Sequence, residues 1–180
     1  MTNAELTVLL DRIIDREGRS YTAYPDPQHP GQWIDPPTRF GITADELGDW
    51  RHLGRAATAQ EVQNLEEPEA RAIYVARYIV GPRFAEIADA VLREAVIDFG
   101  INSGQPRAAF YLQQAAGVTR DMIVGPVTLT AVNGQDALVL LARVTRQRVA
   151  VLCRWIRARL AARAQFLGVI DRAVSFLPSS

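Results

Sequence analysis

Apolar residues recur three or four positions apart along most of the chain, and this helical spacing constrains the fold more than any other feature. Residues 3–17 show it first, and Gly18 follows them as a helix-stop signal. Capping-box pairs, in which a threonine precedes a glutamate by three positions, open the next two helices at Thr43 and Thr58. Helices are then predicted over residues 58–78, 85–101, 107–116 and 136–165, with short ones starting at Pro126 and spanning 169–176.

Residues 18–42 interrupt this pattern. They hold five prolines, several aromatic residues and few aliphatic ones, which predicts a loop with at most a small hairpin. We therefore expect an all-α fold (α+β at most) in which one irregular loop or small hairpin stands out. A chain of 180 residues suits a single domain over residues 1–180, made of one lobe over 1–80 and a helical lobe over 81–180.

The composition is that of an ordinary globular protein, with 48% hydrophobic and 22% charged residues. Twenty basic and twenty acidic residues balance to a net charge of zero, so nothing predicts binding to nucleic acid. No stretch approaches the roughly 18 consecutive apolar residues of a membrane helix, so stable membrane insertion is not expected. We expect a monomer.

Few residues suit metal or redox chemistry. The single cysteine, Cys153, excludes an intramolecular disulfide and is expected to be a buried structural thiol in the long helix. His29 and His52 lack metal-ligand spacing, so no metal or other cofactor is predicted. The first residues lack the basic start of a secretory signal, which predicts synthesis in the cytoplasm without a signal peptide.

Glu17 is the first candidate for chemistry. It continues the apolar stripe formed by Leu6, Leu10 and Ile13, and it also ends the helix, where backbone carbonyls concentrate negative charge. Both effects favour the protonated carboxylic acid over the ionised carboxylate. The protonated form is the one that a general acid needs to cleave a glycoside. The alternative is a glutamate at a frayed helix end that reaches water past Gly18.

Five segments together resemble the lysozyme-like muramidases of glycoside hydrolase family 108, which occur among phage endolysins. This resemblance implies a cofactor-free enzyme that hydrolyses the bond between N-acetylmuramic acid and N-acetylglucosamine in the glycan strands of bacterial peptidoglycan. It also implies a peptidoglycan-binding region in the helical lobe. The segments are EGRSYTAYPDP (17–27), PPTRFGIT (36–43), FGINSGQPRAAFYLQQAAG (99–117), DMIVGPVTLTAV (121–132) and, more weakly, FLGVIDRA (166–173).

The resemblance carries the catalytic acid of the family onto Glu17, its loop threonine onto Thr38 and its cleft asparagine onto Asn102. The second carboxylate stays open between two residues. Asp26 lies nine positions after Glu17, as in the related phage lysozymes, and is favoured; Asp35 lies three positions before Thr38. Either aspartate alternatively serves only an Asp-Pro turn.

In this hypothesis protonated Glu17 donates to the glycosidic oxygen, and an ionised aspartate orients a water or stabilises the oxocarbenium-like sugar. Thr38 is expected to hold that water. Tyr21, Tyr24 and Trp33 offer flat faces for sugar rings; the alternative is aromatic packing that holds the loop down, which explains Trp33 equally well. Two differences from the family are one extra residue in 18–21 and a longer loop over 27–37.

Two other functions fit the same residues: a lytic transglycosylase, which needs one acid only, and a peptidoglycan-binding module without catalysis. A phage endolysin is the favoured setting, with action in the periplasm or cell wall after release. An injected toxin and a prophage enzyme are the alternatives, and the sequence identifies no holin or immunity partner. One charge needs explanation in any setting: Arg148 lies on an apolar stripe, where snorkelling is favoured over pairing with Asp98.

Overall fold

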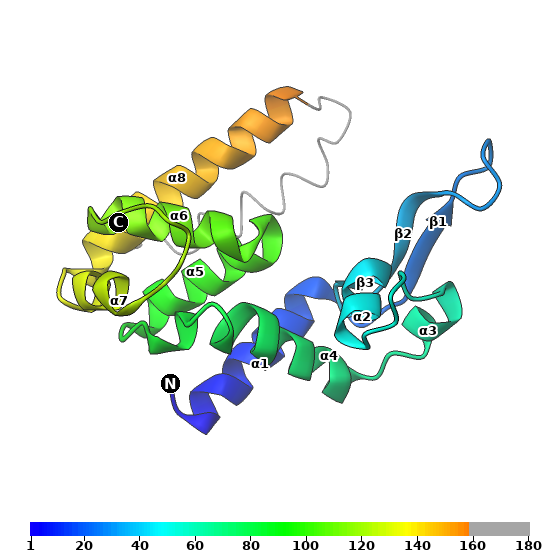
Figure 1. The fold of residues 1–180 in the computed structure, drawn as a ribbon, viewed down its shortest axis with the longest axis horizontal. Helices are drawn as coiled ribbons and strands as arrows, with labels where there is room; N and C mark the ends of the chain where they lie inside the picture. The colour runs from blue at the N-terminus through cyan, green and yellow to red at the C-terminus, as the bar shows by residue number, and fades with distance from the viewer. Residues whose placement is uncertain (159–180) are drawn as a thin grey trace. The chain divides into compact units, whose positions relative to one another are not determined.

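The computed structural model describes residues 1–158 and shows two compact units, one over residues 2–76 and one that starts at Arg77. The predicted fold class is confirmed, because helices dominate and strands form only one small antiparallel sheet (Figure 1). The predictions for residues 159–180, including the helix over 169–176 and the resemblance of the segment FLGVIDRA, lie outside the described residues.

The first unit joins four α-helices to the sheet. α1 (Asn3–Glu17) leads into β1 (Thr22–Pro25), β2 (Trp33–Arg39) and β3 (Ile42–Thr43), which pair in the order β1-β2-β3. α2 (Ala44–Trp50), α3 (Ala59–Gln63) and α4 (Glu67–Tyr74) follow, and α1 packs against α4. The buried core of this unit includes Leu9, Leu10, Ile13, Ile14, Ile42, Leu47, Val62, Leu65, Ile73 and Tyr74.

Local sequence signals explain where these helices begin. The hydroxyls of Thr43 and Thr58 each accept a hydrogen bond from the backbone amide three residues later. The backbone amide of each threonine donates in turn to the side chain of that glutamate, so both predicted capping boxes are present. The single helix predicted over 58–78 is wrong, because α3 ends at Gln63 and a new helix begins at Glu67. Pro68 causes this break, since proline is favoured in the first turn of a helix, where its missing N–H costs nothing.

A π-helical stretch over Val75–Val80 joins the two units along the chain. In the second unit a 3₁₀ turn (Phe84–Glu86) precedes α5 (Ala90–Ser103), α6 (Gln105–Ala116), α7 (Pro126–Asn133) and α8 (Ala137–Ala158). α5 contacts both α6 and α8, and α6 also contacts α7 and α8. The helix predicted over 85–101 starts later than expected, at Ala90, because the Asp89 side chain accepts from the Leu92 amide and caps it there.

Two further expectations in this unit are wrong. Cys153 is exposed rather than buried. Arg148 does not snorkel, because it is buried and forms an ion pair with Asp98. Among residues 1–158, no helix is long and apolar enough to cross a membrane.

Candidate active site

Glu17 is the last residue of α1 and lies where the chain leaves the helix. Gly18 follows with φ 85°, and its amide donates to the carbonyl oxygen of Ile14 at 2.9 Å. The neighbouring Ile13 and Ile14 are buried, whereas Glu17 is half-buried. Its side chain therefore lies at the solvent end of the core stripe, where an acid can be partly shielded from water and still meet a substrate.

The turn between β2 and β3 packs directly on Glu17. Phe40 and Gly41 both have left-handed backbone conformations, with φ 53° and 75°, which is the geometry of a two-residue type I′ hairpin turn. A Cβ atom placed on Gly41 would lie 2.8 Å from Cβ and 3.0 Å from Cγ of Glu17. Glycine is therefore required here both by its φ angle and by the closeness of the glutamate stem.

Tyr74 completes this contact, although no pattern in the sequence singles it out. It is the last residue of α4, its side chain is buried, and its hydroxyl donates to the carbonyl oxygen of Phe40 at 2.8 Å. The same hydroxyl oxygen would lie 2.5 Å from a Cβ on Gly41. A buried tyrosine normally finds a hydrogen-bond partner, and in this case the partner is the turn that contacts the proposed acid.

The strands β1 and β2 with the turn between them are called the hairpin, and the stretch Thr38–Thr43, where β2 meets β3, is called its inner end. Thr38 lies at this inner end. Thr38 pairs with Thr22 of β1 and with Thr43 of β3. Its side chain is half-buried, and its hydroxyl donates to the carbonyl oxygen of Pro36 at 3.1 Å. The structure thus brings Thr38 to the part of the sheet that also contacts Glu17.

The two candidate aspartates lie farther out along the hairpin. Asp35 pairs with Tyr24 and is exposed, three residues from Thr38 along β2. Asp26 belongs to the tip, four residues beyond Thr22. At roughly 3.3 Å per strand residue, Asp35 lies about 10 Å and Asp26 about 13 Å along the strands from the Thr22–Thr38 pair.

The Asp26 carboxylate is held within the tip itself. One oxygen accepts from the Gln28 amide and the other contacts Nδ1 of His29, both at 2.8 Å. The hydrogen bond to His29, followed by the bond from Gln28, lowers the pKa of Asp26 below its usual value. Asp26 is therefore ionised at neutral pH, and both of its oxygens have local partners.

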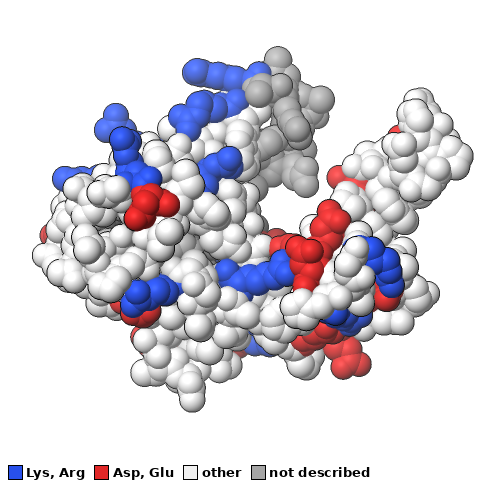
Figure 2. Space-filling model, in the orientation of Figure 1, with Lys and Arg blue, Asp and Glu red and all other residues white. Residues whose placement is uncertain are grey.

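The aromatic candidates lie on or beside the same hairpin. Tyr24 is 58% and Trp33 is 41% exposed, whereas Tyr21 is half-buried between α1 and β1. Residues 21–37 carry no formal charge other than the two aspartates, and Figure 2 shows the outer part of the hairpin as a largely uncharged surface. Exposed aromatic rings on such a surface can stack on the apolar faces of sugars.

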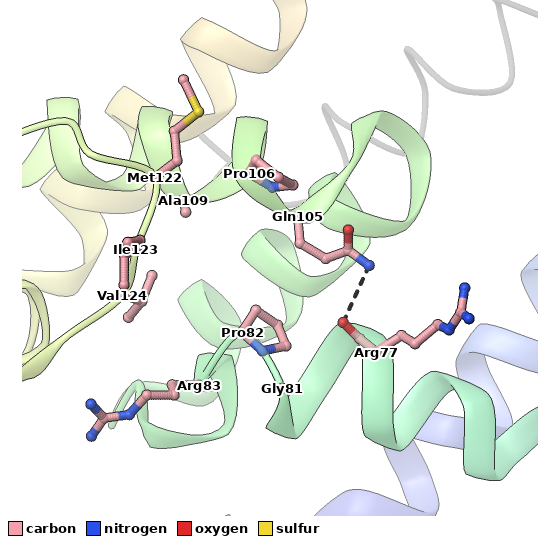
Figure 3. Close-up of a pocket in the computed structure, with 10 residues that line it drawn as sticks. All are labelled: Arg77, Gly81, Pro82, Arg83, Gln105, Pro106, Ala109, Met122, Ile123 and Val124. Atoms are coloured by element: carbon pink, nitrogen blue, oxygen red, sulfur yellow. Dashed lines mark hydrogen bonds between the residues drawn. The ribbon is translucent and has the colours of Figure 1, made fainter. Parts of the chain in front are cut away.

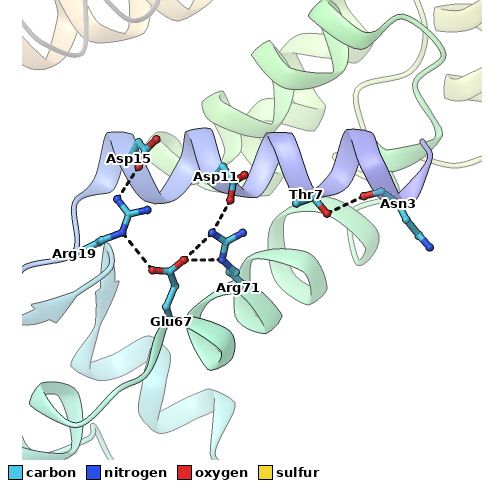
Figure 4. A network of polar contacts seen from close by, with 7 residues as sticks. All are labelled: Asn3, Thr7, Asp11, Asp15, Arg19, Glu67 and Arg71. Atoms are coloured by element: carbon cyan, nitrogen blue, oxygen red, sulfur yellow. Dashed lines mark hydrogen bonds and ion pairs between the residues drawn. The ribbon is translucent and has the colours of Figure 1, made fainter.

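A network of ion pairs holds α1 against the start of α4 (Figure 4). Arg71 bonds both Asp11 and Glu67 at 2.7 Å, and Arg19 links Glu67 to Asp15. Arg19 belongs to the stretch that carries the extra residue relative to the family pattern. It therefore secures the chain directly after Glu17, a role that the sequence alone did not indicate.

Asn102 belongs to the second unit. Its amide donates to the carbonyl oxygen of Asp98 at 2.8 Å, which is a bond to the preceding turn of α5. A cavity of about 300 Å³ lies in the same unit, formed by α6, the segment after Val80 and the loop before α7 (Figure 3). Its described lining residues include arginines but no carboxylic acid, so this cavity supplies no general acid: Arg77, Gly81, Pro82, Arg83, Gln105, Pro106, Ala109, Met122, Ile123 and Val124.

Metal-assisted chemistry has no evident ligand set in the described part of the chain, where no three His, Cys, Asp or Glu side chains gather closely enough to hold an ion. A partly shielded glutamic acid at a helix end, beside a hairpin with exposed aromatic rings, is compatible with the cleavage of a glycoside. Comparisons with known proteins lead to the same chemistry.

The family model described as Glycosyl hydrolase 108 matches residues 10–104, which is more than half of the chain and includes Glu17 and the whole hairpin. The chain belongs to this family, and it is a glycoside hydrolase that acts on peptidoglycan. Among solved structures, that of Brucella abortus SagA aligns over 99% of this chain and 99% of its own, with a TM-score of 0.73 and 27% identity. No curated protein matches.

Proposed function

We propose that the protein is an N-acetylmuramidase that hydrolyses the bond between N-acetylmuramic acid and N-acetylglucosamine, with Glu17 as the general acid. The observation that carries the proposal is the contact between Glu17 and the Phe40–Gly41 turn. This contact holds a half-buried carboxylic acid next to a hairpin whose exposed aromatic residues suit a glycan strand.

In the proposed reaction the Glu17 carboxyl donates its proton to the glycosidic oxygen as the bond to the sugar carbon breaks. Water adds to the resulting oxocarbenium-like carbon and gives its proton to an ionised carboxylate. The spacing in the sequence favours Asp26 for that base, but the strand register places Asp35 nearer to the inner end of the hairpin. We therefore propose Asp35, with Asp26 as the alternative and Thr38 as a ligand of the attacking water.

The direct test is Glu17→Gln, which keeps the shape of the side chain and removes the proton. Release of soluble muropeptides from purified sacculi should fall by about 10²-fold to 10⁴-fold, the usual contribution of general acid catalysis. The melting temperature should stay close to that of the wild type. Glu66→Gln is a matched control, because Glu66 is exposed and makes no side-chain cap bond. Wild-type activity in Glu17→Gln would refute the assignment.

A lytic transglycosylase is the second candidate. The observation in its favour is the same register, which leaves both aspartates about 10 Å or more along the strands from Thr38. A transglycosylase uses one acid, and the sugar's own hydroxyl closes an anhydro ring in place of water. Mass spectrometry of the released muropeptides separates the two, because hydrolysis leaves reducing ends and transglycosylation leaves anhydro ends.

We also propose that the protein acts as a phage endolysin on peptidoglycan in the periplasm or cell wall. In this role the second unit would help to bind the cell wall through its arginine-lined cavity. A free carboxylate of a wall peptide would bind Arg83 at the edge of the cavity by replacing its ion pair with Glu86. Co-sedimentation of inactive Glu17→Gln with sacculi tests this binding. A variant with Arg83→Met should sediment less, and unchanged sedimentation would count against the cavity.

A further inference from the structure

We propose that Tyr74 is a positioning residue for the catalytic acid: its hydroxyl anchors the Phe40–Gly41 turn against Glu17 and so fixes the direction of the carboxyl group. This inference rests on the proposed function of Glu17. Tyr74 would not touch the substrate, and it would act only through the turn.

The turn needs an anchor because its backbone is unfavourable without one. Phe40 has φ 53°, a left-handed conformation that residues with a Cβ adopt only when their surroundings hold them there. Its side chain is buried, so its carbonyl oxygen cannot rely on bulk water. The Tyr74 hydroxyl is the partner of that oxygen, at 2.8 Å.

The anchored turn lies in close contact with the acid. Gly41 follows Phe40 directly, and a Cβ on it would come within 3.0 Å of the Tyr74 oxygen and of two carbons of Glu17. Such spacing leaves no room for the turn to move toward either residue. The Glu17 stem therefore has the Gly41 backbone as a fixed wall, which limits the rotamers open to its carboxyl group.

Tyr74 is itself held in a fixed position relative to Glu17. It ends α4, and the ion pairs of Arg71 with Asp11 and of Glu67 with Arg19 hold that helix to α1, the helix that carries Glu17. Tyr74 therefore contacts the Phe40–Gly41 turn, the turn contacts Glu17, and the ion pairs in Figure 4 connect the helices that carry Tyr74 and Glu17. Removal of the hydroxyl should loosen the acid without removing it.

The test compares Tyr74→Phe with Tyr111→Phe. Each variant removes a hydroxyl that takes part in a hydrogen bond: that of Tyr74 donates to Phe40, and that of Tyr111 accepts from Arg154 in the second unit. With a soluble glycan substrate, Tyr74→Phe should lower kcat by about 10-fold to 100-fold, since small misplacements of catalytic groups have effects of this size. KM should change less than twofold, and Tyr111→Phe should keep wild-type kcat.

The same measurements in the Glu17→Gln background separate positioning from general damage. If Tyr74 acts through Glu17, then Tyr74→Phe should have less than a twofold further effect on the residual rate of Glu17→Gln. An unchanged kcat in Tyr74→Phe would overturn the inference, and so would an equal loss in both backgrounds. High activity of Glu17→Gln itself would refute the proposed function, and the inference would fall with it.

Discussion

Arg148 of α8 and Asp98 of α5 form an ion pair at 2.5 Å between side chains that are only 3% and 4% exposed. The guanidinium also lies over the ring of Phe99, 5.8 Å from its centroid. A charge on the apolar stripe of α8 is thus matched by a charge on α5, in the middle of the helical packing of the second unit. Such a pair is costly to break from one side only.

We predict that Arg148→Met lowers the free energy of unfolding by about 3–5 kcal/mol, because it leaves the Asp98 carboxylate buried without its arginine. The double variant Arg148→Met with Asp98→Leu should recover most of that loss, since apolar replacement of both partners restores packing without an unmatched charge. Urea unfolding followed by circular dichroism measures both. Arg154→Met, an exposed change on the same helix, should cost about 1 kcal/mol or less.

A second prediction concerns acid stability and the cap of α3. Hydrogen bonds from Arg55, and then from Thr58, lower the pKa of Glu61 from 4.5 to about 2. Because the folded pKa lies below the unfolded one, the stabilisation is fully present above pH 4.5 and is lost as the pH falls toward 2. Wild type should therefore be more stable than Glu61→Gln at pH 7, and the two melting temperatures should converge near pH 2.

The control for that prediction is Glu66→Gln, whose side chain makes no cap bond. Its difference from wild type at pH 7 should be small, because the side chain caps no backbone amide. A constant gap between wild type and Glu61→Gln from pH 7 to pH 2 would show that the Arg55 and Thr58 contacts do not shift the titration of Glu61.

The third prediction separates the two aspartates. Asp35→Asn should lower kcat for sacculus hydrolysis by about 10²-fold if Asp35 is the base, the lower end of the usual range for such catalysis. Asp26→Asn should change kcat less than threefold, because the Asp26 oxygens are occupied by Gln28 and His29 in the tip. The opposite ranking would favour Asp26 as the base. Full activity in both variants, together with anhydro products, would instead identify a transglycosylase.

The sequence predicted those parts of the fold that depend on local patterns. Apolar spacing located α1 and α6 closely, and the capping boxes at Thr43 and Thr58 are present as predicted. The sequence did not reveal where long helical stretches break, because the proline and cap at the start of a new helix leave the apolar spacing intact. The sequence also predicted that Arg148 would snorkel to solvent. This was wrong because the burial of Arg148 depends on α5 packing against α8, which no local pattern reveals.

The candidate site was predicted only in part for a related reason. Glu17 follows from its place on the stripe of α1, and Thr38 from a resemblance of its segment. Tyr74 contacts the turn beside Glu17, and Arg19 pairs with Glu67 of α4; both contacts exist only after α1, the sheet and α4 have packed. Contacts of this kind depend on tertiary structure and leave no local signature.

The last prediction tests the close approach of the Phe40–Gly41 turn. Gly41→Ala should reduce kcat by about 10²-fold, because its Cβ would lie 2.8 Å from Glu17 and 2.5 Å from the Tyr74 oxygen and must displace one of them. Gly54→Ala is the matched control: Gly54 has a similar φ of 67°, but a Cβ there meets nothing within 4 Å. Gly54→Ala should cost about 1–2 kcal/mol of stability through the left-handed backbone. Gly41→Ala should cost more, because its Cβ also clashes with Glu17 and Tyr74, and only Gly41→Ala should impair catalysis by the folded protein. Equal activities of the two variants would show that the turn does not control the position of Glu17.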